Sequence, residues 1–415
     1  MSEQRKVPKL RFPEFTEDWE QRKLGDLGTT YTGLSGKTSS DFGHGEARFV
    51  TYMNVYSNPV ANPNMIEPVE IDKKQNEVNV GDVFFTTSSE TPEEVGMSSV
   101  LLEKQGHLYL NSFCFGYRPK QKIDPYYLAF MLRSEPVRKK IIFLAQGISR
   151  YNISKNKMME ICVPLPSLGE QKKIGNFCKN LDELITLHQR KCDVLKKLKK
   201  GLLQKMFPKD GTNIPEIRFP EFTDAWEQRK LGDIGSARSG VGFPDAEQGG
   251  IEGIPFFKVS DMNNVGNENE LVSANNYVSD EQIKRKRWNV ITDVPAIFFA
   301  KVGAAVMLNR KRLVRFPFLL DNNTMAYIFD KKTWDCDFGK TLFETIDLTK
   351  LTQTGALPSY NASDVEDIEI YLPNIEEQKA IGAFFLQLDN LITLHQRKLE
   401  VLKKLKKRLL QQMFV

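Results

Sequence analysis

The sequence predicts an α+β protein in which two β-rich mixed bodies and two long helices are arranged as an internal repeat. Residues 181–207 return as residues 388–414, with 22 of 27 positions identical. Residues 8–28 return as residues 215–235, also 207 positions later, with 16 of 21 positions identical. The longer repeat has a helical apolar periodicity. These three observations indicate two half-chains of one design.

The longer repeat has the pattern of a long helix with a packing partner. Its apolar residues recur at heptad spacing, and no proline interrupts the chain between Gly169 and Pro208. Such a helix spans about 37 residues, or roughly 55 Å, and the second copy is its candidate partner. The predicted helix-helix or partner contacts are Leu181, Leu184, His188, Leu195, Leu198, Leu202, Leu388, Leu391, His395, Leu402, Leu405 and Leu409.

Each half-chain reads as an opening segment, a variable body, a proline-rich exit and a long helix. The predicted bounds are 1–166 for the first body, 167–207 for the central helix, 208–373 for the second body and 374–415 for the C-terminal helix. Residues 29–146 and 236–354 share little identity, so a fixed frame holds two differently tuned modules. Their exits align Tyr151-Asn152 with Tyr360-Asn361, which leaves two additional residues in the first.

Both bodies have more strand than helix in this reading. Runs of β-branched and aromatic residues lie between glycine, proline and asparagine, as is typical of strands. Two segments have apolar residues at helical spacing instead. The predicted strands are residues 46–56, 82–87, 98–102, 254–259, 296–300 and 304–308, and the predicted helices are residues 125–144, as one or two, and 334–346.

The composition is that of a globular protein. The 415 residues are 40% hydrophobic and 27% charged, which suits two to three domains. No run of about 18 apolar residues is present, so we expect a cytoplasmic location. The five cysteines include no CxxC pair, which favours reduced thiols over a disulfide framework or a zinc site.

The net charge of +5 is concentrated in the repeated helices. Residues 181–207 carry seven Lys/Arg against three Asp/Glu, and residues 388–414 carry seven against two. These segments contribute +4 and +5, so the rest of the chain has a net charge of −4. Any anion-binding surface on the bodies must therefore be a local patch.

The familiar catalytic motifs are missing. The GLSGKT stretch at residues 33–38 has Tyr31 where a phosphate-binding loop needs glycine, so a flexible loop is the better interpretation. The Asn-Pro pairs at Asn58 and Asn62 lack the rest of an adenine-methylating signature. His188 and His395 are better explained as polar residues that fix helix register than as metal ligands. We expect a non-catalytic chain without its own cofactor or metal, although carboxylates from distant segments would leave no motif.

Short basic runs are the best candidate nucleic-acid contacts in the bodies. Lysine and arginine neutralise phosphates, and neighbouring aromatic residues add a stacking group. Each run alone is more often ordinary solvated surface, but their presence in both bodies favours the functional interpretation. They are residues 284–288 (KRKRW) and 310–315 (RKRLVR) in the second body, and Arg133, Arg138, Lys139, Lys140, Arg150 and Tyr151 in the first.

With these features the chain resembles a specificity (S) subunit of a Type I restriction-modification system. The resemblance covers nearly the whole chain and rests on the opening motif RFPEFTEDWEQRKLGDLG and its copy, the exits VPLPSLGEQKKI and YLPNIEEQKAI, and the long helices. It implies that the bodies are target-recognition domains, each reading one half of a bipartite DNA target. The helices would pack antiparallel as a pseudo-twofold spacer that sets the gap between the halves.

The same resemblance implies the partners. The helices would dock two modification (methyltransferase) subunits, and restriction (ATPase/nuclease) subunits and double-stranded DNA would complete the complex. S-adenosylmethionine, and ATP with magnesium, would be bound by the partner subunits and not by this chain.

The resemblance also suggests DNA-contacting residues, at two strand ends in each body. Short polar side chains would read bases, and lysine and arginine would position phosphates. The predicted contacts are Thr51, Asn54, Thr87, Ser88, Arg150 and Tyr151 in the first body, and Lys258, Ser260, Lys301, Arg310, Lys311 and Tyr360 in the second.

Two other classes of function stay open at this point. One is a coiled-coil scaffold whose bodies bind proteins or sugars, which would show no salt-sensitive, sequence-selective DNA binding. The other is a self-contained restriction-methylation enzyme, which the missing motifs disfavour. The DNA letters, the gap, the assignment of bodies to half-sites and the presence of a restriction subunit do not follow from the sequence.

Overall fold

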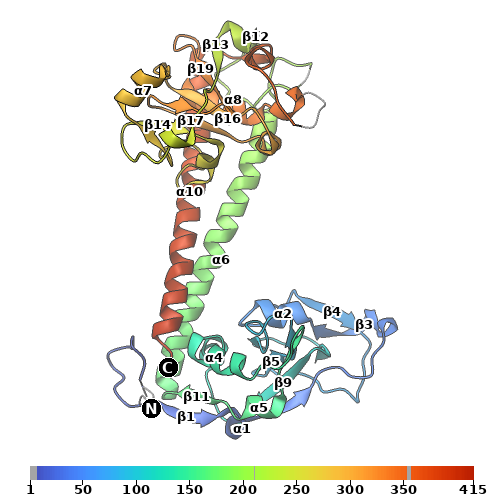
Figure 1. Cartoon of the computed structure of the whole chain (residues 1–415). Coiled ribbons are helices and arrows are strands. Elements are labelled where there is room, and N and C mark those ends of the chain that lie inside the picture. Colours follow the sequence, from blue (N-terminus) through green and yellow to red (C-terminus); the bar gives the residue numbers. More distant parts are fainter. Residues whose placement is uncertain (1–6, 210, 353–356) are drawn as a thin grey trace. The chain divides into compact units, whose positions relative to one another are not determined.

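Two helices of 38 residues each, α6 (Leu168–Lys205) and α10 (Ile375–Gln412), confirm the long helices that the sequence predicts. They belong to a computed structural model that describes residues 7–209, 211–352 and 357–415. The chain forms two units: unit 1 is Met1–Gln189 with Arg397–Val415, and unit 2 is Arg190–Gln396. Each unit therefore contains one body and one half of each long helix (Figure 1). Thr354, the last residue of the variable segment 236–354, lies outside the described residues.

The two bodies share three sheets of the same topology, which confirms the α+β class and the internal repeat; unit 1 has the pair β10-β6 in addition. Unit 1 contains a four-stranded sheet β2-β9-β5-β7, a three-stranded sheet β4-β3-β8 and the pair β1-β11. Unit 2 contains β13-β19-β16-β17, β15-β14-β18 and β12-β20 in the same relations. In both three-stranded sheets the central strand pairs antiparallel with one neighbour and parallel with the other. The divergent sequences of the two bodies thus share one frame.

The elements of unit 1 before α6 follow in chain order: β1 (Glu20–Lys23), α1 (Leu24–Leu27), β2 (Gly28–Thr32), η1 (Ser39–Asp41), β3 (Phe42–Val50), α2 (Tyr52–Ser57), β4 (Ile66–Val69), β5 (Val83–Thr86), β6 (Ser88–Ser89), β7 (Ser98–Val100), β8 (Leu108–Leu110), β9 (Cys114–Pro119), α3 (Pro125–Met131), α4 (Glu135–Phe143), β10 (Tyr151–Asn152), α5 (Lys155–Met159) and β11 (Cys162–Leu165).

Those of unit 2 between the long helices are β12 (Glu227–Lys230), η2 (Leu231–Asp233), β13 (Gly235–Ser239), η3 (Asp245–Glu247), β14 (Ile254–Phe257), η4 (Val259–Asn263), β15 (Tyr277–Val278), α7 (Asp280–Lys286), β16 (Ala296–Ala300), η5 (Ala304–Leu308), β17 (Lys311–Val314), β18 (Leu319–Leu320), β19 (Thr324–Phe329), α8 (Cys336–Thr345), η6 (Leu348–Leu351), α9 (Ala362–Glu366) and β20 (Glu369–Leu372).

Two predicted strands are wrong in part or in full. The strand predicted at residues 46–56 ends at Val50, because the Thr51 hydroxyl accepts a hydrogen bond from the Asn54 N–H and starts helix α2. The strand predicted at residues 304–308 is the 3₁₀-helix η5, which lies between two residues of positive φ, Gly303 and Asn309. Both are local hydrogen-bonding or backbone effects that override β propensity.

The opening segment of each half ties together the ends of both long helices within its unit. In unit 1 the Leu10 N–H donates to the Gln412 carbonyl at the end of α10, and in unit 2 the Ile217 N–H donates in the same way to Lys205 at the end of α6. The aromatic residue after each helix, Phe414 or Phe207, lies in the apolar core of the same unit. Each body is therefore closed by the helix end that the chain supplies from the other half.

Bidentate arginine-glutamate pairs attach the opening segments to the starts of the helices. Arg11 donates to both carboxylate oxygens of Glu170 at 2.7 and 2.8 Å, and Arg218 donates to those of Glu377 at 2.7 and 2.7 Å. Both glutamates are at most 1% exposed. Hydrogen bonding to Glu170 raises the pKa of Arg11, and hydrogen bonding to Glu377 raises that of Arg218. Such charge-assisted, two-point bonds also fix the angle between segment and helix.

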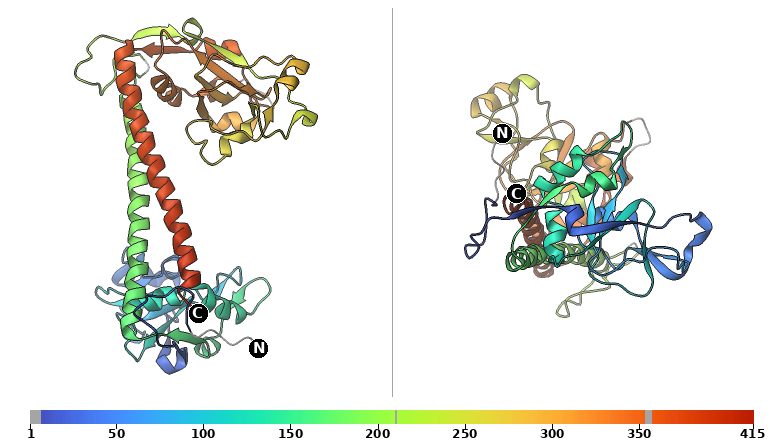
Figure 2. Two further views of the ribbon diagram at one scale, coloured as in Figure 1. Left: turned by 90° about the vertical axis from the view of Figure 1, so that its left-hand side faces the viewer. Right: turned by 90° about the horizontal axis from the view of Figure 1, so that it is seen from below.

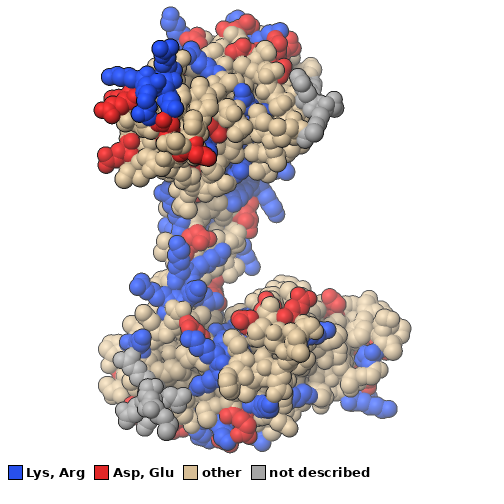
Figure 3. Space-filling view, viewed as in Figure 1, with Lys and Arg blue, Asp and Glu red and all other residues tan. Residues whose placement is uncertain are grey.

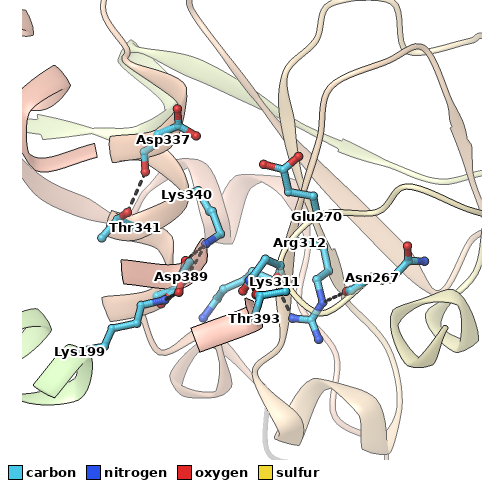
Figure 4. A network of polar contacts seen from close by, with 12 residues as sticks. Lys199, Asn267, Glu270, Lys311, Arg312, Asp337, Lys340, Thr341, Asp389 and Thr393 are labelled. Atoms are coloured by element: carbon cyan, nitrogen blue, oxygen red, sulfur yellow. Dashed lines mark hydrogen bonds and ion pairs between the residues drawn. The ribbon is translucent and has the colours of Figure 1, made fainter. Parts of the chain in front are cut away.

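The halves of α6 and α10 within a unit run antiparallel and side by side, as both Figure 1 and Figure 2 show. In unit 1 Lys406, near the end of α10, contacts Asp182, near the start of α6, at 2.5 Å. In unit 2 the equivalent pair is Lys199 and Asp389, at 2.6 Å. Lys340 of α8 also reaches Asp389, so the unit 2 pair belongs to a larger network (Figure 4).

The helix seam contains only part of the predicted set of helix-helix or partner contacts. Leu181 and Leu388 are 6% exposed and lie in this seam. The second heptad series is shifted by one residue: Cys192, Ile392 and Leu399 are buried. The predicted stripe would have placed Lys191 and Lys205 inward. The observed stripe instead contains Lys199 in α6 and Lys406 in α10, and each of these has an acidic partner. Four predicted contacts are therefore outside this seam and between 42% and 49% exposed, namely Leu184, Leu198, Leu391 and Leu405.

The other predicted contacts fall on the less exposed side of the helices. They are half-buried and one heptad apart, in series with Leu181 in α6 and with Leu388 in α10. This series comprises His188, Leu195 and Leu202 in α6, and His395, Leu402 and Leu409 in α10. None of the helices in the described ranges is long and apolar enough to cross a membrane.

Replacing Arg218 with methionine should destabilise unit 2, because Glu377 would keep its buried charge and lose its partner. We expect the free energy of unfolding of unit 2 to fall by about 3–5 kcal/mol. Urea unfolding followed by tryptophan fluorescence measures this, since unit 2 contains Trp226, Trp288 and Trp334, three of the four tryptophans. Arg229→Met is the control, because the Arg229 ion pair within the described ranges is with exposed Glu227. Equal effects of the two variants would contradict the role of the buried pair.

Candidate nucleic-acid interface

The predicted contacts of unit 1 gather where β3 and β5 end. Thr51 follows β3 and caps α2, and its hydroxyl donates to the Met65 carbonyl at 3.2 Å. Asn54 is fully buried, and its amide donates to the carbonyls of Asn62 and Met65 at 2.8 and 3.0 Å while its oxygen accepts from the Asn62 N–H. These hydrogen bonds hold α2 in position.

The remaining unit 1 candidates border one hollow of about 490 Å³, whose lining includes Ser88 and Arg150 together with Tyr52, Met53 and Phe113. Arg150 is exposed. Ser88 is buried and accepts from the Tyr52 hydroxyl through its carbonyl, at 2.8 Å.

Thr87 lies between strands β5 and β6, and Tyr151 lies on β10. The Thr87 hydroxyl donates to the Phe113 carbonyl at 2.8 Å. Tyr151 pairs with Ser89 across strands β10 and β6. Tyr151 and Arg150 are therefore presented beside the strand that carries Ser88, on one edge of the body.

In unit 2 one candidate, Ser260, is exposed, and Lys258, Lys301 and Arg310 are half-buried. Lys258 is half-buried and donates to Gln248 Oε1 at 3.1 Å, and Ser260 on η4 is exposed. Lys301 follows β16, as Thr87 follows β5. Arg310 donates from Nη1 to Asn263 Oδ1 at 2.8 Å, which places it against η4. These four side chains remain compatible with DNA contact.

Two unit 2 candidates point inward. Lys311 donates to Asn309 Oδ1 at 2.8 Å and to the Ile346 carbonyl at 2.5 Å, and burial lowers its pKa to about 8. Tyr360 is 3% exposed, donates to the Ala300 carbonyl at 2.5 Å, and has its pKa raised by burial. Both residues hold the body together. In the sequence Lys311 stands between two arginines and Tyr360 between serine and asparagine, so nothing there indicated this inward orientation.

The structure also corrects the predicted alignment of the exits. The N–H of Ile153 donates to the Thr87 carbonyl, and the N–H of Tyr360 donates to that of Lys301. Tyr360 therefore occupies the place of Ile153 and not of Tyr151. Helices α5 and α9 begin 207 residues apart, which is the spacing of the repeat. The first exit therefore has no additional residues between its strand pairing and helix α5.

Most of the predicted basic runs are structural. Arg133 donates to four backbone carbonyls at 2.7–3.0 Å, and Arg138 donates to three at 2.7–2.8 Å. Lys140 binds the Cys162 carbonyl at 2.8 Å. The other inward or ion-paired members are Lys139, bound to Glu135; Arg285 and Lys286, bound to Glu247; Arg312, bound to the Asn267 carbonyl; and Arg315, bound to Glu270 and Asp337.

Exposed positive charge remains over α7. Lys284 and Arg287 are exposed, and Figure 3 shows basic side chains gathered over this helix. Arg287 ends α7 in the left-handed conformation, which turns the chain there. The basic run at residues 284–288 therefore overstates the free positive charge. Two of its four basic residues, Arg285 and Lys286, bind Glu247.

Arg133 and Arg138 position the elements around the unit 1 hollow. Arg133 binds the carbonyls of Val55, Tyr56 and Asn58 at the end of α2, and that of Ser98 in β7. Arg138 binds the carbonyls of Glu93, Val95 and Gly96 in the neighbouring loop. Burial lowers the pKa of both guanidiniums to about 10, and in Arg133 the charge of Arg138 adds to the effect. Their bonds explain why α2 and this loop keep a fixed separation.

Comparison with known proteins gives one family for both halves. Residues 16–197 and 223–404 each match the Type I restriction modification DNA specificity domain. The proposed type I restriction enzyme MjaX specificity subunit of Methanocaldococcus jannaschii is 27% identical over 97% of this chain and 94% of its own length. The type I restriction enzyme MjaVIII specificity subunit of the same organism is 25% identical over 97% of this chain and 92% of its own length.

Solved structures share the fold over the whole chain. The crystal structure of the S subunit of a Type I restriction-modification system from M. genitalium has a TM-score of 0.64, covers 99% of both chains and is 14% identical. A second solved structure, from work on complex assembly and conformational transition of the type I R-M system, has a TM-score of 0.54 and is 16% identical. The match covers 94% of this chain and 96% of that chain.

Replacing Arg133 with methionine should loosen α2, because four carbonyls would lose a buried donor. Each unsatisfied buried group costs about 1–3 kcal/mol, so amide exchange in α2 should accelerate at least about tenfold. Hydrogen exchange read residue by residue measures this. Lys139→Met is the matched control, since the Lys139 side chain is 73% exposed and binds the exposed side chain of Glu135. Unchanged protection of residues 52–57 in the Arg133 variant would contradict the positioning role.

Proposed function

The chain belongs to the Type I restriction-modification DNA specificity family and provides DNA sequence specificity, and we propose that unit 1 and unit 2 each read one half of a bipartite target. The observation that carries this proposal is the repeated frame with unlike surfaces. Three equivalent sheets and the arginine-glutamate pairs occur in both units, while the side chains at the strand ends differ. The scaffold alternative is not favoured, because the family match covers both halves.

Unlike readers on equivalent frames predict an asymmetric target. In unit 1 the strand ends present Met53, Phe113 and Arg150, and in unit 2 they present Ser260, Lys301 and Arg310. Base edges differ in donors, acceptors and methyl groups, so different side chains at equivalent places select different bases. We propose that the α6 and α10 helices set the number of unread base pairs between the half-sites.

Exposed apolar side chains on the long helices support a docking role. Unit 1 carries Leu184 and Leu187 from α6 with Val401 and Leu405 from α10, each at least 42% exposed. Unit 2 carries the repeat-equivalent residues, each at least 46% exposed: Leu391, Leu394, Val194 and Leu198. Large apolar residues exposed at helical spacing mark a protein contact. Because each unit carries the same set, two copies of one partner fit, and we propose that these are two modification subunits.

The chemistry of the complex belongs to its other subunits in this proposal. This chain would place a methyltransferase subunit beside each half-site, and S-adenosylmethionine would bind to that subunit. Restriction subunits, where present, would bind ATP with magnesium. The chain itself would act as a non-catalytic reader of double-stranded DNA.

Methyl transfer to duplex DNA should require the modification subunits. The purified chain alone should transfer no methyl groups, whereas the assembled complex should methylate a bipartite sequence that methylome sequencing identifies. Exchange of residues 29–146 for another body should change one half of that sequence and keep the other. Robust methylation by this chain alone, or a change in both halves, would refute the proposal.

Glutamine at Val194, Leu198, Leu391 and Leu394 should remove one docking surface. Burying one such side chain contributes about 1.5–3 kcal/mol, so the variant should bind one of its two modification subunits at least about 100-fold more weakly. Native mass spectrometry should then show one modification subunit per chain instead of two. Glutamine at Lys196 and Lys197, exposed in the same helix, is the control. An unchanged two-to-one complex would rule out this surface.

A further inference from the structure

Backbone hydrogen bonds define equivalent positions at the strand ends of the two units. The Asn111 N–H donates to the Val50 carbonyl at 3.2 Å, and the Asp321 N–H donates to the Phe257 carbonyl at 3.0 Å. Both bonds join the end of a central strand to a short turn. The turn lies against a glycine in each unit, where an added Cβ would be 2.1 Å from the Asn111 oxygen at Gly33 and 1.9 Å from the Asp321 oxygen at Gly240.

A second pair of bonds fixes the tip of each turn. The Thr87 N–H donates to the Phe113 carbonyl at 3.0 Å, and the Lys301 N–H donates to the Asn323 carbonyl at 2.9 Å. Phe113 and Asn323 are therefore equivalent.

Met53 and Ser260 are equivalent as well. Each lies three residues after the bonded strand residue and just before a fully buried one, Asn54 or Asp261. The frame thus superposes an apolar pair in unit 1, Met53 with Phe113, on a polar pair in unit 2, Ser260 with Asn323.

The apolar pair of unit 1 forms a ridge. Met53 is 53% exposed and Phe113 is 57% exposed. Together with Tyr52 they line both of two neighbouring hollows, of about 490 and 580 Å³, so they stand between them. Arg150 lines the first hollow, as do Glu90 and Glu94. Two large apolar side chains at the tips of this frame are suited to contact with an apolar group of a ligand.

The polar pair of unit 2 has hydrogen-bonding side chains at the same places. Ser260 and Asn323 are exposed. Their neighbours Lys258 and Arg310 are held by Gln248 and Asn263, and these bonds limit the positions that the two cations can take. An exposed asparagine can bond the N6 and N7 edge of adenine, which an apolar side chain cannot do.

We propose that residues 53 and 113 in unit 1, and their equivalents 260 and 323 in unit 2, are specificity determinants, and that Met53 and Phe113 read thymine through its 5-methyl group. This inference rests on the proposed function, in which each unit reads one half-site. In the major groove the thymine methyl is the apolar feature that distinguishes this base, and apolar side chains contact it. Ser260 and Asn323 read their half-site by hydrogen bonds, so the two halves differ in the chemistry of readout.

The test uses the assembled complex with its modification subunits. Methylome sequencing defines the target, and exchange of residues 29–146 assigns one half to unit 1. Binding is then measured on duplexes in which each thymine of that half is replaced by uracil, which lacks the methyl group. Loss of one buried methyl should weaken wild-type binding about fourfold. The Met53→Ser, Phe113→Asn double variant should bind thymine and uracil duplexes equally, and the same replacement in the other half should leave both proteins unaffected.

Two further variants serve as the converse exchange in unit 2 and as a control. Ser260→Met with Asn323→Phe should change the methylated sequence only in the unit 2 half. Val80→Ser is the control for a lost exposed apolar side chain, because Val80 is 61% exposed and precedes β5, whereas Thr87 follows it. The control should retain the wild-type preference for thymine.

Three outcomes would overturn the inference while leaving the proposed function intact. They are a unit 1 half-site without a thymine, equal wild-type affinity for thymine and uracil duplexes, and a double variant that still prefers thymine. An apolar wedge between base pairs would give the second result, since it depends on stacking and not on the methyl group. Failure of the proposed function is distinct, because the wild-type complex would then show no salt-sensitive, sequence-selective binding at all.

Discussion

The buried ion pair between an opening-segment arginine and the first turn of a long helix is the constraint on which each unit depends. Glu170 and Glu377 have almost no exposed surface, so their charges are tolerated only because a guanidinium satisfies both oxygens. The same opening segment bonds to the last turn of the other long helix. One short stretch of chain therefore fixes two helix ends against one body, and this explains why it is nearly identical in the two halves.

Within the unit 1 body, residues that hold the frame are distinct from the exposed residues that we propose contact DNA. Asn54, Arg133 and Arg138 are polar or charged, yet their hydrogen bonds go to backbone carbonyls and amides of the body itself. Their bonds fix short helices and turns whose tips carry side chains free to vary. Specificity can then change at a few exposed positions without loss of stability, because the buried network does not depend on those positions.

The long helices make a similar division between two faces. The inner face packs Cys192 and Leu399 and places one lysine per helix beside an acidic residue. The outer face leaves leucine and valine exposed at helical spacing. The heptad pattern contains two neighbouring apolar stripes, and each of them is interrupted by lysine. By apolar spacing alone, either stripe could be the seam between the helices. The lysine decides between them, since it can be buried only where a carboxylate meets it.

The sequence by itself determined the duplication, the long helices, the mixed β-rich bodies and the family resemblance, because repeats and apolar periodicity are written directly in the order of residues. Only the tertiary structure decided which heptad stripe is the seam, that Tyr360 is equivalent to Ile153, and that Lys311 and Arg312 face inward. The candidate site followed the same division: its strand ends were predicted, but the ridge of Met53 and Phe113 was not. Each of these outcomes depends on which carbonyl or carboxylate lies within reach of a side chain, and such partners are distant in sequence.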